Sequence, residues 1–345
     1  MRFASIFLAM AILTAPAVGR DIFVNNMGGN DGYTGHQRLS TPDRSGPVQT
    51  IAKALRLAFP GDRIVLIKSG EPYRETITLT GSRHSGILDM PLTLEGEEGV
   101  VLEGSAPVPK GAWKHYKEAT FRFRPKQFQY QNLFVDGRPM VFVWADPQHA
   151  TPPKLEKREW CLHGGYIYFC VEPNMLPDDY DLSHTSLETG ITLNHVNKVK
   201  IVGLTIQGFQ VDGVNLANSA RKIKMINCKI RGNGRNGITV GGASDLELHG
   251  CVVGNNGRAQ ILTLPHSVTV AVGTQLFSNT APGRVDRGGK FFLNGKQFEG
   301  NIDDETLIEE VTGKAVERHG ADQAPVEVPK DKPAGPVSPE GRPIY

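Results

Sequence analysis

A repeat of about 23 residues constrains the fold of this chain more than any other feature. Val202–Leu216, Ile226–Val240 and His249–Thr263 align under one another, and the pattern continues from Val272. One column of this alignment, with steps of 24, 23 and 23 residues, holds Gly203, Asn227, Gly250 and Gly273. Each unit consists of short alternating stretches between Gly and Asn turns, which is typical of strands. Because one unit cannot bury its apolar face alone, the sequence predicts a coil in which each strand pairs with its copy one turn later.

Two columns of the repeat predict particular side-chain stacks. Cys228 and Cys251 share an inward-pointing column, so we expect buried thiols that stack, in preference to a disulfide or a metal site. Asn233, Asn256 and Asn279 recur at intervals of 23 residues. Stacked Asn side chains can hydrogen-bond along a coil at a bend and tolerate left-handed backbone there.

The other two cysteines, Cys161 and Cys170, flank a predicted hairpin with Gly164-Gly165 as its turn. An oxidising compartment favours a bridge across such a hairpin. The register implied by the turn does not place the two residues opposite each other. A disulfide and two free thiols both stay open on the sequence.

The N-terminus has the pattern of a secretory signal peptide. Arg2 provides the positive charge, Ile6–Leu13 the short apolar core, and Ala15-Pro-Ala17 and Ala17-Val-Gly19 two possible cleavage signals. We expect residues 1–19 to be removed and the mature chain to be secreted or periplasmic. No other segment reaches the roughly 18 apolar residues of a membrane span.

Charge narrows the choice of partner. The net charge of +2 argues against a general nucleic-acid binder. From His195 to Leu262 there are nine Lys and Arg against three Asp and Glu. This basic stretch could attract an acidic polymer, and it could equally be a solvated face of the coil.

The regions around the repeat have separate roles. Apolar spacing predicts a helix over Ile51–Phe59, stopped by Pro60-Gly61, that covers the open end of the coil. Residues 20–104 are then the cap and first turns, and residues 189–300 the main repeats. Residues 105–188 break the pattern and contain all three Trp and 14 of the 26 aromatic residues, which predicts an inserted antiparallel β subdomain. Residues 301–345 are expected to form a short helix and a Pro-rich disordered tail.

Four segments carry a family resemblance: residues 24–32 (VNNMGGNDG), 50–54 (TIAKA), 60–66 (PGDRIVL) and 73–75 (YRE). Together with the repeats, they resemble pectate-lyase-like β-helix proteins over residues 21–104 and 189–280. The resemblance implies an all-β, single-stranded right-handed parallel β-helix, here with an N-terminal capping helix and an inserted subdomain. That superfamily is rich in polysaccharide lyases and glycoside hydrolases and also has non-enzymatic members, so the fold alone does not assign an activity. We expect a monomer that acts on, or binds, polysaccharide.

The resemblance also indicates where chemistry would sit. Polygalacturonases, which share this fold, carry acidic residues just before the strand that contains Val214 and its copies. Asp212 matches one such acid, but Asn236 and Ala259 occupy the next two turns. Because a hydrolase normally needs two carboxylates, the polygalacturonase mechanism is disfavoured.

A β-eliminating lyase on an acidic glycan is the alternative enzyme. Arg235 and Arg258 fall about 4.8 Å apart on neighbouring turns, and a uronate carboxylate would relieve their repulsion. Lys229 and Arg231 are candidate bases for removal of the C5 proton, and Asp212 could help to hold a cation. Solvated arginines on a non-catalytic, carbohydrate-binding surface are the competing interpretation.

Calcium is the one cofactor that the sequence suggests. Asp31, within Gly28-Gly29-Asn30-Asp31-Gly32, is a weak candidate ligand because a tight calcium site needs more oxygen atoms than this turn supplies. The turn is therefore expected to be structural in the first place.

Overall fold

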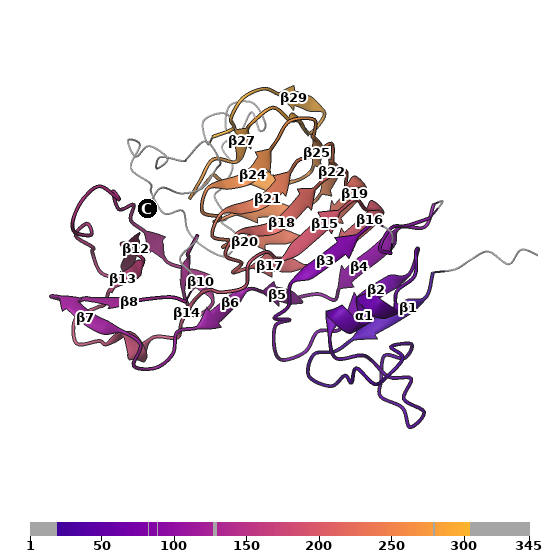
Figure 1. Ribbon diagram of the computed structural model, residues 1–345, viewed down its shortest axis with the longest axis horizontal. Coiled ribbons are helices and arrows are strands. Elements are labelled where there is room, and N and C mark those ends of the chain that lie inside the picture. The colour runs from indigo at the N-terminus through magenta and orange to yellow at the C-terminus, as the bar shows by residue number, and fades with distance from the viewer. Residues whose placement is uncertain (1–18, 82, 88, 127–129, 279, 304–345) are drawn as a thin grey trace, which may run out of the picture.

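The computed structural model describes residues 19–81, 83–87, 89–126, 130–278 and 280–303, and three mostly parallel sheets wind a coil through them (Figure 1). Sheet A contains, in spatial order, β1 (Asp21–Val24), β2 (Arg63–Leu66), β4 (Leu92–Gly96), β16 (Asn197–Val202), β19 (Arg221–Ile226), β22 (Asp245–His249), β25 (Val268–Val272), β28 (Lys290–Leu293) and β29 (Lys296–Phe298). Sheet B contains β26 (Gln275–Leu276), β23 (Val252–Gly254), β20 (Lys229–Arg231), β17 (Thr205–Gln207) and β5 (Val101–Glu103). Sheet C contains β27 (Arg284–Asp286), β24 (Ala259–Thr263), β21 (Asn236–Val240), β18 (Asp212–Ala217), β15 (Ile191–Asn194) and β3 (Ile77–Thr80). In the main repeats the chain visits sheets A, B and C once per turn.

Strand pairing reproduces the columns of the repeat. Ile230 pairs with Val253 across β20 and β23, and both side chains are fully buried. Cys228 and Cys251 precede this pair, are buried and free, and lie against each other. The hydrogen bond between the thiols and their burial raise the pKa of Cys228 well above its ordinary value. The predicted cysteine stack is confirmed, and each buried aliphatic side chain of the coil contributes roughly 1.5–3 kcal/mol.

The bend between sheets A and B explains the Gly and Asn column. Gly203, Asn227, Gly250 and Gly273 all have left-handed backbone, with φ of 69°, 52°, 60° and 56°. Glycine adopts this conformation without steric cost, and Asn tolerates it better than most residues. The recurring residue type therefore follows from one backbone requirement, repeated every turn.

Asn233 and Asn256 stack at the bend between sheets B and C. Asn233 Nδ2 donates to Asn256 Oδ1 at 2.9 Å, and Asn256 Nδ2 donates to Gln260 Oε1 at 2.8 Å. The left-handed residues here are the preceding ones, Gly232 (φ 64°) and Asn255 (φ 56°). The prediction of the stack at one bend is correct for these two turns, and the left-handed backbone lies one residue before each stacked Asn. Asn279 lies outside the described residues.

The helix α1 (Ile51–Leu57) packs beside β1 and β2 at the N-terminal end of the coil. Thr50 caps it through a bond from Lys53 N, and the carboxylate of Glu75 accepts from Ile51 N and Ala52 N at 2.8 and 3.0 Å. The helix is shorter than the predicted segment, because Ala58 is already extended. Its buried side chains, Ile51, Ala54 and Leu55, join the core of the coil.

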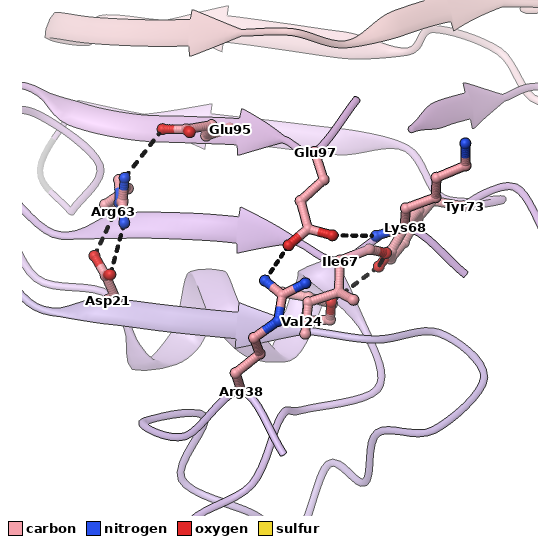
Figure 2. A network of polar contacts seen from close by, with 9 residues as sticks. All are labelled: Asp21, Val24, Arg38, Arg63, Ile67, Lys68, Tyr73, Glu95 and Glu97. Atoms are coloured by element: carbon pink, nitrogen blue, oxygen red, sulfur yellow. Dashed lines mark hydrogen bonds and ion pairs between the residues drawn. The ribbon is translucent and has the colours of Figure 1, made fainter. Parts of the chain in front are cut away.

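Polar contacts tie the first turns together, as Figure 2 shows. Arg63 on β2 lies between Asp21 on β1 and Glu95 on β4, at 2.7 and 3.4 Å. Glu97 accepts from Arg38 and from the backbone nitrogen of Lys68. These contacts join segments that are far apart in the sequence.

The buried side chain of Tyr73 makes a second set of contacts in the same region (Figure 2). Its hydroxyl lies 2.9 Å from Val24 O and 2.7 Å from Ile67 O. Tyr73 and Glu75 therefore both stabilise the first turns.

Residues between β5 and β15 form two antiparallel layers beside the coil (Figure 1). The inner sheet, which contacts the coil, contains β10 (Arg138–Pro139), β9 (Leu133–Val135), β14 (Leu182–Thr185) and β6 (Ser105–Pro107). The outer sheet contains β11 (Val141–Phe142), β12 (Glu159–His163), β13 (Tyr166–Cys170), β8 (Thr120–Phe123) and β7 (Lys114–Lys117), of which β11 and β12 run parallel. A 3-10 helix, Pro177–Asp179, precedes β14. Apolar side chains of both sheets share one core.

The cysteines of the insertion are free thiols. In the hairpin closed by Gly164-Gly165, Cys161 lies opposite Tyr168, whereas Cys170 lies opposite Thr120 of another strand. The register therefore separates the two sulfurs and resolves the alternative that the sequence left open. Burial raises the pKa of Cys161 to about 12, so this thiol stays protonated.

Most of each predicted terminal segment lies outside the residues that the structure describes. The predicted signal peptide, residues 1–19, lies outside the described residues except for Gly19. The predicted helix and Pro-rich tail, residues 301–345, lie outside them except for residues 301–303. Within the described residues, no helix combines the length and apolar character needed to cross a bilayer.

Candidate functional site

The bend between sheets B and C brings the predicted site residues onto successive turns. Asp212 pairs in register with Asn236, and Asn236 with Ala259, at the starts of β18, β21 and β24. Arg235 and Arg258 precede the last two. The sequence alignment therefore placed these residues correctly relative to one another along the coil.

Asp212 forms an ion pair with Arg235 and is completely buried. Arg235 Nε and Nη2 donate to Asp212 Oδ1 and Oδ2 at 2.9 and 2.6 Å. Burial alone would lower the pKa of Arg235, but the hydrogen bonds and charge of Asp212 raise it above its ordinary value. Both oxygens of Asp212 therefore bind Arg235, and a role of Asp212 in catalysis or in holding a cation stays a prediction.

Tyr130 of the insertion lies against both arginines of the bend. The guanidinium carbons of Arg235 and Arg258 are 5.7 and 5.9 Å from the centroid of its ring. The insertion also approaches the backbone here: a Cβ on Gly234 would lie 2.5 Å from Tyr130 O. The two cations expected to repel each other are therefore held by Asp212 and by an aromatic ring, whose negative face attracts them.

Arg258 differs from Arg235 in its partners. It is half-buried, and its side chain has no carboxylate within ion-pair distance among the described residues. A guanidinium with a free planar edge matches a carboxylate group. Arg258 is therefore the cation of this bend that can bind an anion from solution.

Lys229 and Arg231 lie on sheet B, on the strand that enters the bend. Lys229 is exposed and pairs in register with Thr205 and Val252. Arg231 Nε donates to Gln207 Oε1 at 2.8 Å. Arg231 therefore has a partner along sheet B, and the role of Lys229 or Arg231 as the base for the C5 proton stays a prediction.

Asp31 supports the start of the helix. Its Oδ1 accepts from Gln49 N and Thr50 N, both at 2.9 Å, and its Oδ2 accepts from Thr50 Oγ1 at 2.7 Å. Burial opposes ionisation, but the bonds from Thr50 and Gln49 outweigh it and lower the pKa of Asp31. Its oxygens are thus committed to protein donors. The described residues contain no group of three or more His, Cys, Asp or Glu side chains that could hold a metal ion.

A cavity of about 300 Å³ lies beside sheet B in the first turns, and none of the predicted site residues lines it. The residues that line it include Lys68 and Tyr73, drawn in Figure 2, and Glu71 and Glu103. Glu103 is nearly buried and accepts from Gln207 Nε2 at 2.6 Å and Ser105 N at 2.9 Å. Sequence reasoning missed this cavity because its residues come from different turns and share no column.

Comparisons with known proteins agree with this architecture. Residues 189–301 match the family described as right-handed beta helix region. A solved glycoside hydrolase is 12% identical with a TM-score of 0.51, over 78% of this chain and 74% of that one. The complex of XylC with xylose is 13% identical (TM-score 0.39, 79% and 69%), and so is pectate lyase Pel9A (TM-score 0.39, 76% and 54%). No curated protein sequence matches the chain.

The family match and the similarity to the glycoside hydrolase establish the fold. The chain is a single-stranded right-handed parallel β-helix protein, as its resemblance to pectate-lyase-like proteins predicts. Fold similarity at this level of identity does not assign a substrate.

Proposed function

We propose that the protein is an exported β-helix protein that binds an acidic polysaccharide at the bend between sheets B and C. Arg258 carries the proposal, because it is a half-buried cation held against Tyr130 with no carboxylate partner among the described residues. Arg235 contributes less, because its charge is compensated by Asp212. A uronate carboxylate would bind Arg258 through charge-assisted hydrogen bonds.

The bonds of Asp212 favour binding of the polysaccharide at this bend over its cleavage there. A buried carboxylate with both oxygens bonded to Arg235 offers neither an acid nor a nucleophile to a sugar. Export is supported by the signal-peptide pattern of residues 1–19.

The test compares Arg258→Ala with Arg221→Ala, a matched loss of charge at an exposed position on sheet A. Binding of polygalacturonate and alginate to the purified mature protein is measured by titration calorimetry. Arg258→Ala should weaken binding at least about tenfold, because a charge-assisted hydrogen bond contributes roughly 1.5–3 kcal/mol. Arg221→Ala should bind like the wild type. Equal affinity of Arg258→Ala and the wild type contradicts the proposal.

The cavity beside sheet B favours a second candidate function, glycoside hydrolysis. Glu71 and Glu103 both line it, and acid-base hydrolysis of a glycosidic bond requires a pair of carboxyl groups. The donors to Glu103 are neutral groups, whereas Asp212 is paired with a cation. Release of reducing ends from neutral and acidic glycans tests this candidate. Activity that Glu71→Gln and Glu103→Gln abolish, and that the exposed Glu98→Gln preserves, would establish it. A rise in absorbance at 235 nm would instead indicate a lyase.

A further inference from the structure

The two faces of the outer sheet of the insertion differ in character. Phe123, Trp160 and Phe169 point toward the inner sheet and fill the shared core. The alternating residues point the other way, since side chains of a strand alternate between its faces. Arg122 and Tyr168 lie opposite each other on this second face. The next position on β13 is Tyr166, which lies opposite His163 of β12.

Tyrosine rings hold the arginines of this face. The guanidinium carbon of Arg122 is 4.8 Å from the ring centroid of Tyr166 and 5.8 Å from that of Tyr116. Arg124 lies 5.6 Å from the Tyr166 ring. Tyr116 in turn contacts Tyr168 edge to face, with centroids 5.0 Å apart. Stacking fixes the plane of a guanidinium and leaves its N–H groups at the edge for a ligand.

Two buried nitrogen atoms on this face have no hydrogen-bond partner among the described residues: Arg122 Nε and His163 Nδ1. An unpaired buried donor is unfavourable, and native proteins contain few of them. Both atoms belong to the face that carries the tyrosines. Because protein atoms cover Arg122 Nε, a ligand would contact this guanidinium through its terminal N–H groups.

The residue that pairs with Arg122 across the neighbouring strand is also a cation. Lys114 is its neighbour across β7 and β8 and is exposed. Among the described residues, no carboxylate lies within ion-pair distance of Lys114 or Arg122. Positive potential and flat aromatic rings together suit a sugar that carries an anionic group.

We propose that this face of the insertion, defined by Tyr116, Arg122, Tyr166 and His163, is a second glycan-binding site. Its ligand is a sugar unit with an anionic oxygen group, either a uronate carboxylate or a sulfate ester. Arg122 contacts the anion, and Tyr166 supports the sugar ring. The site goes beyond the proposed function, because it is built entirely from the insertion and does not involve Arg258.

The experiment counts sites. Titration calorimetry of the mature protein with a short oligogalacturonide should show two sites per chain. Arg122→Gln should remove one and Arg258→Ala the other. A sulfated galactan oligosaccharide, which carries sulfate esters and no carboxylate, distinguishes the two kinds of anion. A neutral xylo-oligosaccharide should bind at least about tenfold more weakly at this face.

The two proposals fail in different ways. A wild type with one site, lost in Arg258→Ala and kept in Arg122→Gln, overturns the second site alone. One site lost only in Arg122→Gln overturns the function assigned to the bend. Should Arg122→Gln disturb folding, Arg122→Lys keeps the charge and removes Nε. Unchanged affinity in a folded Arg122→Lys protein also overturns the role given to this guanidinium.

Discussion

Asp212 and Arg235 form a two-point ion pair across one full turn of the coil. Asp212 is completely buried, and the side chain of Arg235 is 28% exposed. We expect Asp212→Asn to destabilise the protein by more than the ~0–1 kcal/mol of a surface pair and by less than the roughly 3–5 kcal/mol of a fully buried one. Urea unfolding measures the change.

The double variant Asp212→Asn with Arg235→Leu is the control for this pair. It leaves no charge without a partner, so it should be more stable than Asp212→Asn alone. A double variant that is less stable than either single variant would show that the two residues act independently.

Removal of Asn256 should weaken the bend between sheets B and C. Asn256 Oδ1 accepts from Asn233 N and Nδ2, and its amide donates to Gln260 Oε1. Asn256→Ala leaves these buried groups without partners, which costs about 1–3 kcal/mol. Asn197→Ala, at an exposed position of β16, is the matched control and should change the free energy of unfolding by less than ~0.5 kcal/mol.

Asp62 should make the N-terminal end of the coil sensitive to acid. Its buried carboxylate binds Arg20 Nη2 at 2.8 Å and Phe59 N at 2.9 Å. Burial would raise the pKa of Asp62, but the bonds from Arg20 and Phe59 lower it below its ordinary value. The resulting stability is present above the unfolded pKa of about 3.9 and is lost as pH falls through the lower folded pKa.

The measurement is urea unfolding of the wild type and Asp62→Asn at several pH values. The difference in free energy of unfolding should be largest near neutral pH and shrink below about pH 4. A constant difference over that range would mean that ionisation of Asp62 does not contribute.

The backbone nitrogen of Arg20 donates to Asp62 Oδ1 at 2.9 Å, which bears on the mature N-terminus. Cleavage of the predicted signal peptide after Gly19 would turn this nitrogen into a charged α-amino group beside a buried carboxylate. If the predicted cleavage occurs there, N-terminal sequencing of the processed protein should begin at Arg20. An N-terminal extension of one glycine should lower its stability, and a mature chain that begins at Val18 would contradict the assignment.

The repeat made the coil predictable because one backbone requirement recurs every turn. The left-handed bend at Gly203 and Asn227 and the stack of Cys228 on Cys251 follow directly from the alignment. The contacts of the candidate site could be predicted less well from the alignment. The position of Asp212 could be predicted, but its pairing with Arg235 depends on how both side chains fold over the bend.

Contacts made by the insertion had no periodic signal at all. Tyr130 lies against Arg235 and Arg258, yet nothing in its sequence neighbourhood distinguishes it from the other aromatic residues of residues 105–188. Register within the insertion was better determined. The Gly164-Gly165 turn fixes Cys161 opposite Tyr168, and this pairing accounts for the free thiols.

The insertion leaves the coil after β5 and returns at β15, at the bend where the next turn needs only residues 208–211. β5 and β15 nevertheless pair with β17 and β18 in unbroken register. Chain length at this bend is thus uncoupled from the winding of the coil, and the entropic cost of a longer loop grows only slowly. The bend can therefore hold inserted domains of different size and sequence. Replacing the insertion would change the ligand that the protein binds while the coil keeps its structure.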